Sequence, residues 1–200
     1  MKSFHLLPLF LLAVNFSGSP APEKPLAFAS AHIEAVKKAF VENNEDIIPW
    51  KPERLLEWDD FLCEPQKQGD AVASTSTSLG IAYQLKNNKL SYNITCHFSK
   101  HKSWGSLKTD YILAHEQAHF DITELHARKL YEALYHYEYK PASFKNDIAA
   151  IYERIVKEKE EMQEAYDGET DHSRKRRVQY DWLEKIDQML VETEMFAVYP

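Results

Sequence analysis

Two stretches in the middle of the chain alternate apolar and polar side chains, as half-buried β-strands do. Residues 81–85 carry Ile, Tyr and Leu at every second position, and residues 90–98 continue the alternation after a short KNNK connection. A period of two places the apolar side chains on one face of a strand and the polar ones on the other. The pattern therefore predicts an antiparallel hairpin with one face on a core and one facing solvent.

Helical sequence dominates the second half of the chain. Residues 109–137 contain no Gly, Pro or Asn and are rich in Leu, Ala, Glu, Lys and Arg, which predicts one long helix. Further helices are predicted over residues 143–166 and 174–194, with residues 167–173 as the loop between them. A small antiparallel sheet followed by a run of helices is an α+β fold.

The start of the chain differs from the rest. Residues 1–19 place one Lys before an apolar run and then small residues, which is the layout of a secretory signal peptide. Residues 20–47 are predicted to comprise a Pro-rich linker and an N-terminal helix, whose apolar positions have helical spacing. We therefore expect one folded domain over residues 48–200, in which the apolar-aromatic stretch 54–65 is interpreted as a strand.

Composition narrows the class of protein. The chain has 200 residues and a formal net charge of −7, which fits one domain and argues against a nucleic-acid binder that neutralises phosphates. No uncharged apolar run reaches the roughly 18 residues that cross a bilayer, so no membrane span is expected. With the signal peptide, this predicts a secreted or periplasmic protein. In such an oxidising compartment we expect Cys63 and Cys96 to form a disulfide.

The predicted helix 109–137 contains the motif H-E-x-x-H. His115 and His119 are four residues apart and lie on one helical face, where both imidazoles can reach one metal ion. Glu116 lies about 100° around the helix and can reach a metal-bound water without being a ligand. Zinc lowers the pKa of such a water to about 7, and a carboxylate base then makes it a nucleophile for an amide carbonyl. The spacing is what zinc-dependent peptide hydrolysis requires, and the alternative is two histidines at a core edge or in solvent.

A catalytic zinc needs a third protein ligand and one open position. Glu138 lies 19 residues after His119 on an unbroken helix, almost 30 Å away at about 1.5 Å per residue. His126 lies about 10 Å along the same axis, which is also too far. A ligand must therefore return from a distant segment. Residues 166–172 are rich in candidates, and His172 is the one of matching ligand type.

At these residues the chain resembles a known family. It is similar to the bacterial family catalogued as domain of unknown function 922, described as predicted secreted zinc-dependent proteases. The resemblance covers about three quarters of the chain, and its most specific part is the run H-E-Q-x-H-F-D-I. The matching stretches are Leu56 to Phe61, Thr75 to Tyr83, Ser103 and Trp104, Leu113 to Ile122, Arg128, Tyr166 and Asp167, Thr170, His172, Gln179 and Trp182.

The resemblance implies a zincin-like fold and site. His115, His119 and His172 would be the zinc ligands, and Glu116 the general base. Ser173 departs from the family pattern, which usually has Gly after the loop histidine. A residue with a side chain is acceptable there unless the position needs a positive φ.

These observations predict a secreted zinc metalloprotease that acts on peptides or proteins. Residues 90–99 would form a sheet edge that aligns an extended peptide above the Zn²⁺. The rival interpretation is a non-catalytic envelope protein whose metal is structural or absent and whose helices form a partner surface. The coordination of the metal separates the two, because a catalytic site keeps one position open.

Overall fold

The computed structural model describes residues 46–65, 71–87 and 89–200. The predicted signal peptide and nearly all of the segment 20–47 lie outside these residues. Within them, the fold is α+β, with a small antiparallel sheet and three α-helices, as the sequence predicts. No helix in the described ranges is long and apolar enough to cross a bilayer.

The predicted hairpin forms the main sheet. Strands β3 (Thr77–Lys86) and β4 (Lys89–Ser99) pair in antiparallel register, and β1 (Ile47–Pro49) adds to the other side of β4, giving the order β1-β4-β3. Because residue pairs such as Ile81 and Ile94 face each other in this register, the apolar side chains of both strands share one face. Strands β2 (Ala73–Ser74) and β5 (Trp104–Gly105) make a second, two-stranded sheet.

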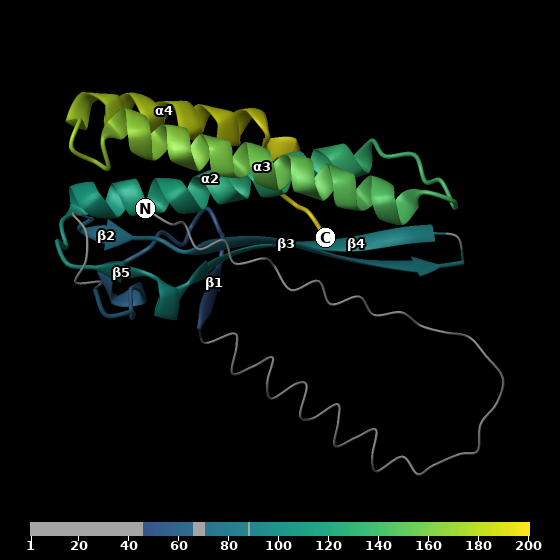
Figure 1. Ribbon diagram of the computed structural model, residues 1–200, viewed down its shortest axis with the longest axis horizontal. Coiled ribbons are helices and arrows are strands. Elements are labelled where there is room, and N and C mark those ends of the chain that lie inside the picture. Colours follow the sequence, from purple (N-terminus) through teal and green to yellow (C-terminus); the bar gives the residue numbers. More distant parts are fainter. Residues whose placement is uncertain (1–45, 66–70, 88) are drawn as a thin grey trace, which may run out of the picture. The chain divides into compact units, whose positions relative to one another are not determined.

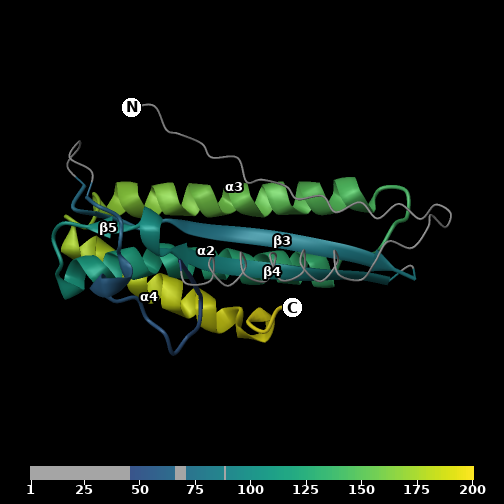
Figure 2. The same cartoon turned by 90° about the horizontal axis from the view of Figure 1, so that it is seen from below.

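Three helices cover the apolar face of the main sheet (Figure 1). They are α2 (Asp110–Tyr135), α3 (Phe144–Thr170) and α4 (Arg176–Glu192). Helix α2 begins where the hydroxyl of Thr109 accepts a hydrogen bond from the amide of Ile112, a typical N-cap. It packs on β3 and β4, and α3 and α4 flank it on either side (Figure 2). Helix α2 is therefore enclosed by other elements along most of its surface.

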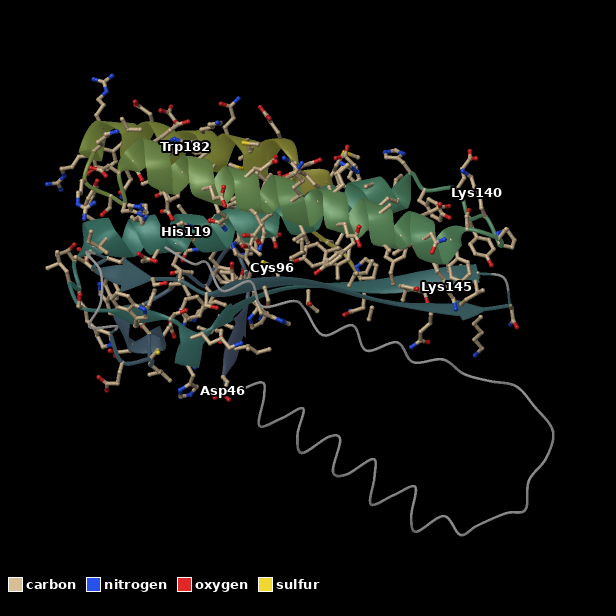
Figure 3. The ribbon with its side chains drawn as sticks, in the orientation of Figure 1. Asp46, Cys96, His119, Lys140, Lys145 and Trp182 are labelled. Atoms are coloured by element: carbon tan, nitrogen blue, oxygen red, sulfur yellow. The ribbon has the colours of Figure 1, made fainter. Side chains whose placement is uncertain are left out.

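Two apolar clusters lie on opposite sides of α2. One joins the helix to the sheet, where the rings of Phe98 and Phe120 lie 5.9 Å apart and both side chains are fully buried. The other joins α2 to α3 and α4, around Ile122, Tyr166 and Trp182. Figure 3 shows His119 of α2 in the layer between α4 and the sheet. Several polar residues of α2 are buried between these layers, among them His115, Glu116, Glu124 and His126.

The segment 54–65 is not a strand, and that interpretation is wrong. Its residues form a short 3-10 helix, η1 (Trp58–Asp60), within extended chain. The carboxylate of Asp60 accepts a hydrogen bond from the amide of Glu57 at 2.8 Å and forms a 2.7 Å ion pair with Arg54. These local bonds hold the segment in a turn in place of strand pairing.

The predicted disulfide is also wrong, since Cys63 and Cys96 are free in the structure. The amide of Cys63 donates to the carbonyl oxygen of Ser103, beyond the end of β4. Cys96 lies seven residues earlier, buried on the face of β4 that meets α2. The two thiols therefore belong to different environments, and burial raises the pKa of the Cys96 thiol well above its usual range.

The remaining differences concern the sheet edge and one helix boundary. The outer strands of the main sheet are β1 and β3, and the sheet edge predicted over residues 90–99 is wrong for residues 97–99, where β4 is paired on both sides. Helix α3 continues to Thr170, whose hydroxyl donates to the carbonyl oxygen of Tyr166 at 2.7 Å. Residues 167–170, predicted as loop, are thus the last turn of a helix, and this places Asp167 rigidly.

Candidate metal centre

The two histidines of the motif converge with a carboxylate from α3. His115 and His119 lie one turn apart on α2, and their Nε2 atoms are 3.2 and 3.1 Å from the same Oδ1 atom of Asp167. These ligand atoms all lie within 4.8 Å of one another, so the group could hold a metal ion. His115 is buried, and Asp167 is partly open to solvent. The donor set of two imidazoles and one carboxylate suits a divalent transition metal.

Neighbouring side chains fix the two imidazole rings in different ways. The Tyr166 ring stacks on His115 with a centroid distance of 4.6 Å and an angle of 23° between the planes. His119 makes a hydrogen bond through Nδ1 to the side-chain oxygen of Gln163. The Nδ1 atom of His115 is buried and has no hydrogen-bond partner among the described residues.

Glu116 lies beside this group with little access to solvent. Its side chain is buried, and its Oε2 atom has no hydrogen-bond partner in the described part of the chain. Burial raises the pKa of Glu116, and the nearby His119 and His115 act in the opposite direction. A buried carboxylate with an unused oxygen is costly for the fold unless a ligand completes it. The residues present therefore fit a bound cation with a polar ligand beside it.

Asp167 and His119 shift one another's pKa values. Burial alone would raise the pKa of Asp167, but hydrogen bonds from His115 and His119 outweigh it and hold that pKa well below its usual range. Burial lowers the pKa of His119, and the Asp167 carboxylate more than reverses this, so the net shift is upward. An anionic carboxylate thus faces two imidazoles at the point where their Nε2 atoms meet.

His172, the third ligand predicted from the sequence, lies next to this group. Its Nδ1 atom is 3.7 Å from Oδ1 of Asp167, and its side chain is 62% exposed. It belongs to a turn in which Asp171, His172 and Ser173 have φ values of 51°, 49° and 71°. All three residues have a left-handed backbone conformation, which residues other than Gly rarely adopt. Ser173 is at the position where the family that this chain resembles usually has Gly. The turn places His172 on the open side of the cluster.

Asp167 is the member of this candidate group that the sequence did not single out as a ligand. It lies within the segment 166–172 that was rich in candidates, but the Gly at position 168 favoured a loop there. A Cβ added at Gly168 would meet nothing within 4 Å, so this glycine is simply an exposed helix position. The continued helix brings Asp167 over the two histidines. The other candidates, His126 and Glu138, lie away from the cluster: His126 bonds the carbonyl oxygen of Ile122 through Nδ1, and Glu138 is exposed beyond α2.

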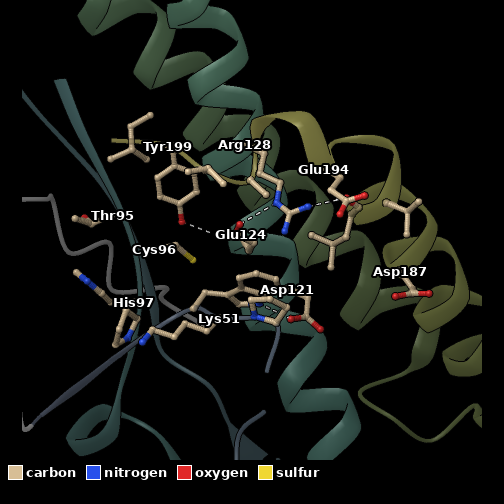
Figure 4. Close-up of a pocket in the computed structure, with 18 of the residues that line it drawn as sticks. Lys51, Thr95, Cys96, His97, Asp121, Glu124, Arg128, Asp187, Glu194 and Tyr199 are labelled. Atoms are coloured by element: carbon tan, nitrogen blue, oxygen red, sulfur yellow. Dashed lines mark hydrogen bonds and ion pairs between the residues drawn. The ribbon is translucent and has the colours of Figure 1, made fainter. Parts of the chain in front are cut away.

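A cavity of about 680 Å³ lies elsewhere on α2 (Figure 4). Asp121, Glu124 and Arg128 line it from α2, and Cys96 and Tyr199 line it from β4 and the C-terminal segment. None of the metal-centre residues lines it. Side-chain exposure in the metal centre instead rises from 5% at His115 to 14% at His119, 33% at Asp167 and 62% at His172. The candidate metal centre is thus most open to solvent on the side of Asp167 and His172.

Comparison with known proteins gives one match. The family model described as "Bacterial protein of unknown function (DUF922)" matches residues 55–173. This range spans the hairpin, the whole of α2 and α3, and the turn that carries His172. No curated protein and no solved structure matches the chain.

Proposed function

The chain belongs to the DUF922 family of bacterial proteins of unknown function, and we propose that it is a zinc-dependent peptidase. One observation carries the proposal. The donor atoms of His115, His119 and Asp167 lie within 4.8 Å of one another, next to a buried Glu116 whose Oε2 atom has no partner among the described residues. A hydrolase needs this combination of metal ligands and a carboxylate base with a free oxygen, and most buried polar atoms of a packing cluster have partners.

His115, His119 and Asp167 would hold the zinc. Two imidazoles and one carboxylate are a common ligand set of catalytic zinc, which leaves one position open. Asp167 is favoured over His172 as the third ligand because its Oδ1 atom already lies within 3.2 Å of both Nε2 atoms. His172 remains a proposed ligand on the open side, where its Nδ1 atom is 3.7 Å from Asp167.

Zinc in this site would supply a Lewis acid that lowers the pKa of a coordinated water and polarises a substrate carbonyl. Glu116 takes a proton from the attacking water at Oε2 and later gives it to the amine nitrogen of the leaving peptide. The remaining hydroxyl becomes part of the new carboxyl group, so one peptide bond and one water are consumed. Burial of Glu116 keeps bulk water away from this proton transfer.

An extended peptide would run along the start of β3, the edge strand next to the centre. The hydroxyls of Thr77 and Thr123 hydrogen-bond at 2.7 Å, which fixes this end of β3 one helical turn after His119. Farther along, the hydroxyl of Tyr152 donates to the carbonyl oxygen of Leu79, so α3 covers the edge there. Residues 75–77 are therefore the part of the edge that we assign to a peptide or protein substrate. The proposed place of action is the periplasm or the exterior, as the signal-like N-terminus suggests.

Replacement of the proposed base tests the chemistry. Glu116→Gln should lower zinc-dependent cleavage of a peptide library by at least about a thousandfold, because no other buried carboxylate oxygen in the centre is unengaged. The variant should still bind one zinc. Glu164→Gln, an exposed change on α3, should cleave at the wild-type rate. Cleavage by Glu116→Gln at the wild-type rate, or a wild-type protein that cleaves nothing when loaded with zinc, would overturn the proposal.

The position of His172 also supports a second function, a structural metal site in a non-catalytic envelope protein. If His172 moved onto the metal, four protein ligands would close the site. X-ray absorption of the zinc-loaded protein separates the two functions. An oxygen ligand that exchanges with solvent or with added inhibitor supports the peptidase, and four unchanging protein ligands support the structural role.

A further inference from the structure

We propose that Gln163 is a positioning residue of the metal centre, which holds the imidazole of His119 with its Nε2 lone pair directed at the metal. The inference rests on the proposed zinc site and adds a residue that neither the motif nor the ligand set includes. Gln163 lies on α3, one turn before Asp167, and is partly buried.

The hydrogen bonds determine which way the carboxamide of Gln163 points. Its Nε2 atom lies 2.8 Å from the backbone carbonyl oxygen of His119. A carbonyl oxygen only accepts hydrogen bonds, so the group that faces it must be the NH₂ of the amide. The side-chain oxygen of Gln163 is therefore the atom that faces Nδ1 of His119.

This orientation determines the proton position on His119. An amide oxygen only accepts, so Nδ1 of His119 must carry a proton and donate it. The proton that His119 donates to Asp167 is then on Nε2, and it is this second proton that a metal ion would replace, while Nδ1 keeps its own. Nε2 is the atom that lies 3.1 Å from Oδ1 of Asp167, at the meeting point of the three donors. Gln163 thus selects the tautomer that can bind a metal there.

Gln163 also connects the three elements around the centre. Its NH₂ group lies 3.4 Å from the hydroxyl of Thr123, which in turn bonds the hydroxyl of Thr77 at 2.7 Å. The carboxamide thus joins α3 to α2, and the hydroxyl of Thr123 joins α2 to the start of β3, so one chain of hydrogen bonds links the His119 ring to the proposed substrate edge.

His115 gives an internal contrast. Its Nδ1 atom has no hydrogen-bond partner in the described part of the protein, and stacking on Tyr166 holds its ring. Stacking restrains the ring plane but does not choose a tautomer. Of the two imidazole ligands, His119 is therefore the one whose metal affinity depends on a hydrogen bond from outside the ligand set.

Zinc affinity of the full chain, measured by competition with a chromophoric chelator, tests the inference. Gln163→Leu removes the acceptor at similar volume and should weaken zinc binding about 10- to 100-fold. Gln163→Glu keeps an oxygen that accepts from Nδ1 but sets its second oxygen against the carbonyl oxygen of His119, so its zinc affinity should fall between those of wild type and Gln163→Leu. The matched control is Gln179→Leu, because Gln179 is a buried glutamine whose NH₂ also donates to an α2 carbonyl, that of Tyr111, at 3.0 Å. It should leave zinc affinity unchanged.

Side-chain ¹⁵N NMR of the wild-type zinc complex gives a readout that needs no variant. We expect His119 to be protonated at Nδ1 and bound to zinc through Nε2. The opposite tautomer, or equal zinc affinity of wild type and Gln163→Leu, would overturn the role of Gln163. An equal loss in Gln179→Leu would also overturn it, as a general packing effect. A wild-type protein that binds no zinc would instead overturn the proposed function itself.

Discussion

The two halves of α2 bury polar side chains in different ways. In the C-terminal half, Glu124 bonds Arg128 at 2.9 Å and accepts a hydrogen bond from Tyr199 at 2.7 Å. In the N-terminal half, His115 Nδ1 and Glu116 Oε2 are buried and have no hydrogen-bond partner among the described residues. One helix thus carries a polar cluster that is satisfied by the protein and another that is not.

We infer a different role for each half from this difference. A buried polar atom without a partner costs about 1–3 kcal/mol, so a cluster that served only stability would complete its hydrogen bonds. The Glu124–Arg128 cluster does so and ties α2 to α4, since Arg128 also donates to the carbonyl oxygen of Leu190 at 2.6 Å. The incomplete cluster around Glu116 is the one that a metal ion and its water would complete.

Breaking the satisfied cluster should have the largest effect on stability. Arg128→Met leaves the buried Glu124 carboxylate without its cation, and we expect the free energy of unfolding in urea to fall by about 3–5 kcal/mol. Arg154→Met is the matched control, because Arg154 and Glu158 form the same i,i+4 pair at 2.8 Å on the exposed face of α3. That change should cost less than about 1 kcal/mol. Similar losses in the two variants would contradict the comparison.

The buried His126, which lies between Glu124 and Arg128 in the C-terminal half, predicts how stability depends on pH. Burial lowers the pKa of His126 to about 4, from about 6.5 in the unfolded chain, despite its hydrogen bond to the carbonyl oxygen of Ile122. Lys129 and Lys159 act in the same direction, and Glu158 opposes them. The unfolded state therefore binds the proton first, and this contribution to stability is complete above pH 6.5 and is lost as pH falls toward 4.

Relative to His126→Phe, the wild type should lose about 2 kcal/mol of unfolding free energy between pH 7 and pH 5. Urea unfolding at the two pH values measures this difference. The comparison with the variant removes the contribution of other groups that titrate in the same range. Parallel pH profiles of the two proteins would show that His126 is not responsible.

Matched changes at the two buried glutamates should give opposite results in metal-free protein. Glu124→Gln removes the counter-charge of Arg128 and should lower the free energy of unfolding by about 2 kcal/mol. Glu116→Gln removes a buried charge that has no ion pair and should leave stability unchanged or raise it by about 1 kcal/mol. Chemical unfolding in the presence of a chelator measures both. A larger loss for Glu116→Gln than for Glu124→Gln would refute the proposed division of α2.

The smallest expected effect is at the left-handed turn beside the centre. Ser173 has φ of 71°, where Gly has no steric penalty, so Ser173→Gly should stabilise the protein by about 1 kcal/mol. Ser91→Gly on strand β4 should instead destabilise it by about 0.5–1 kcal/mol, since β4 is extended there. Thermal unfolding of both variants checks the signs. Destabilisation by Ser173→Gly would mean that the serine contacts outweigh the backbone preference.

The main elements of the fold could be predicted from local patterns. The alternation of apolar and polar residues predicted the hairpin of β3 and β4, and a run without Gly, Pro or Asn predicted α2. Both patterns depend on residues that are neighbours in sequence. The stretch around Trp58 was wrongly interpreted as a strand because the carboxylate of Asp60 bonds Arg54 and the amide of Glu57, which hydrophobicity does not reveal. The predicted disulfide between Cys63 and Cys96 is wrong because the number of cysteines gives no information on the distance between them.

The candidate site was predictable to the extent that it is local. His115, Glu116 and His119 follow from spacing on one helix. Asp167 and Gln163 come from another helix, and their distance from the motif depends on how α3 packs against α2 and on its continuation past Gly168. Sequence periodicity contains no information on how two helices pack, so the positions of Asp167 and Gln163 beside the motif could be found only from the structure.

The most direct test of the central claim is the zinc content of the purified full-length protein, measured by elemental mass spectrometry beside His119→Ala and Asp167→Ala. We predict one zinc per chain in the wild type, none in His119→Ala and at least about a tenfold loss of affinity in Asp167→Ala. A wild-type protein that stays free of metal after refolding with excess zinc, or an Asp167→Ala variant that binds zinc as the wild type does, would contradict the account.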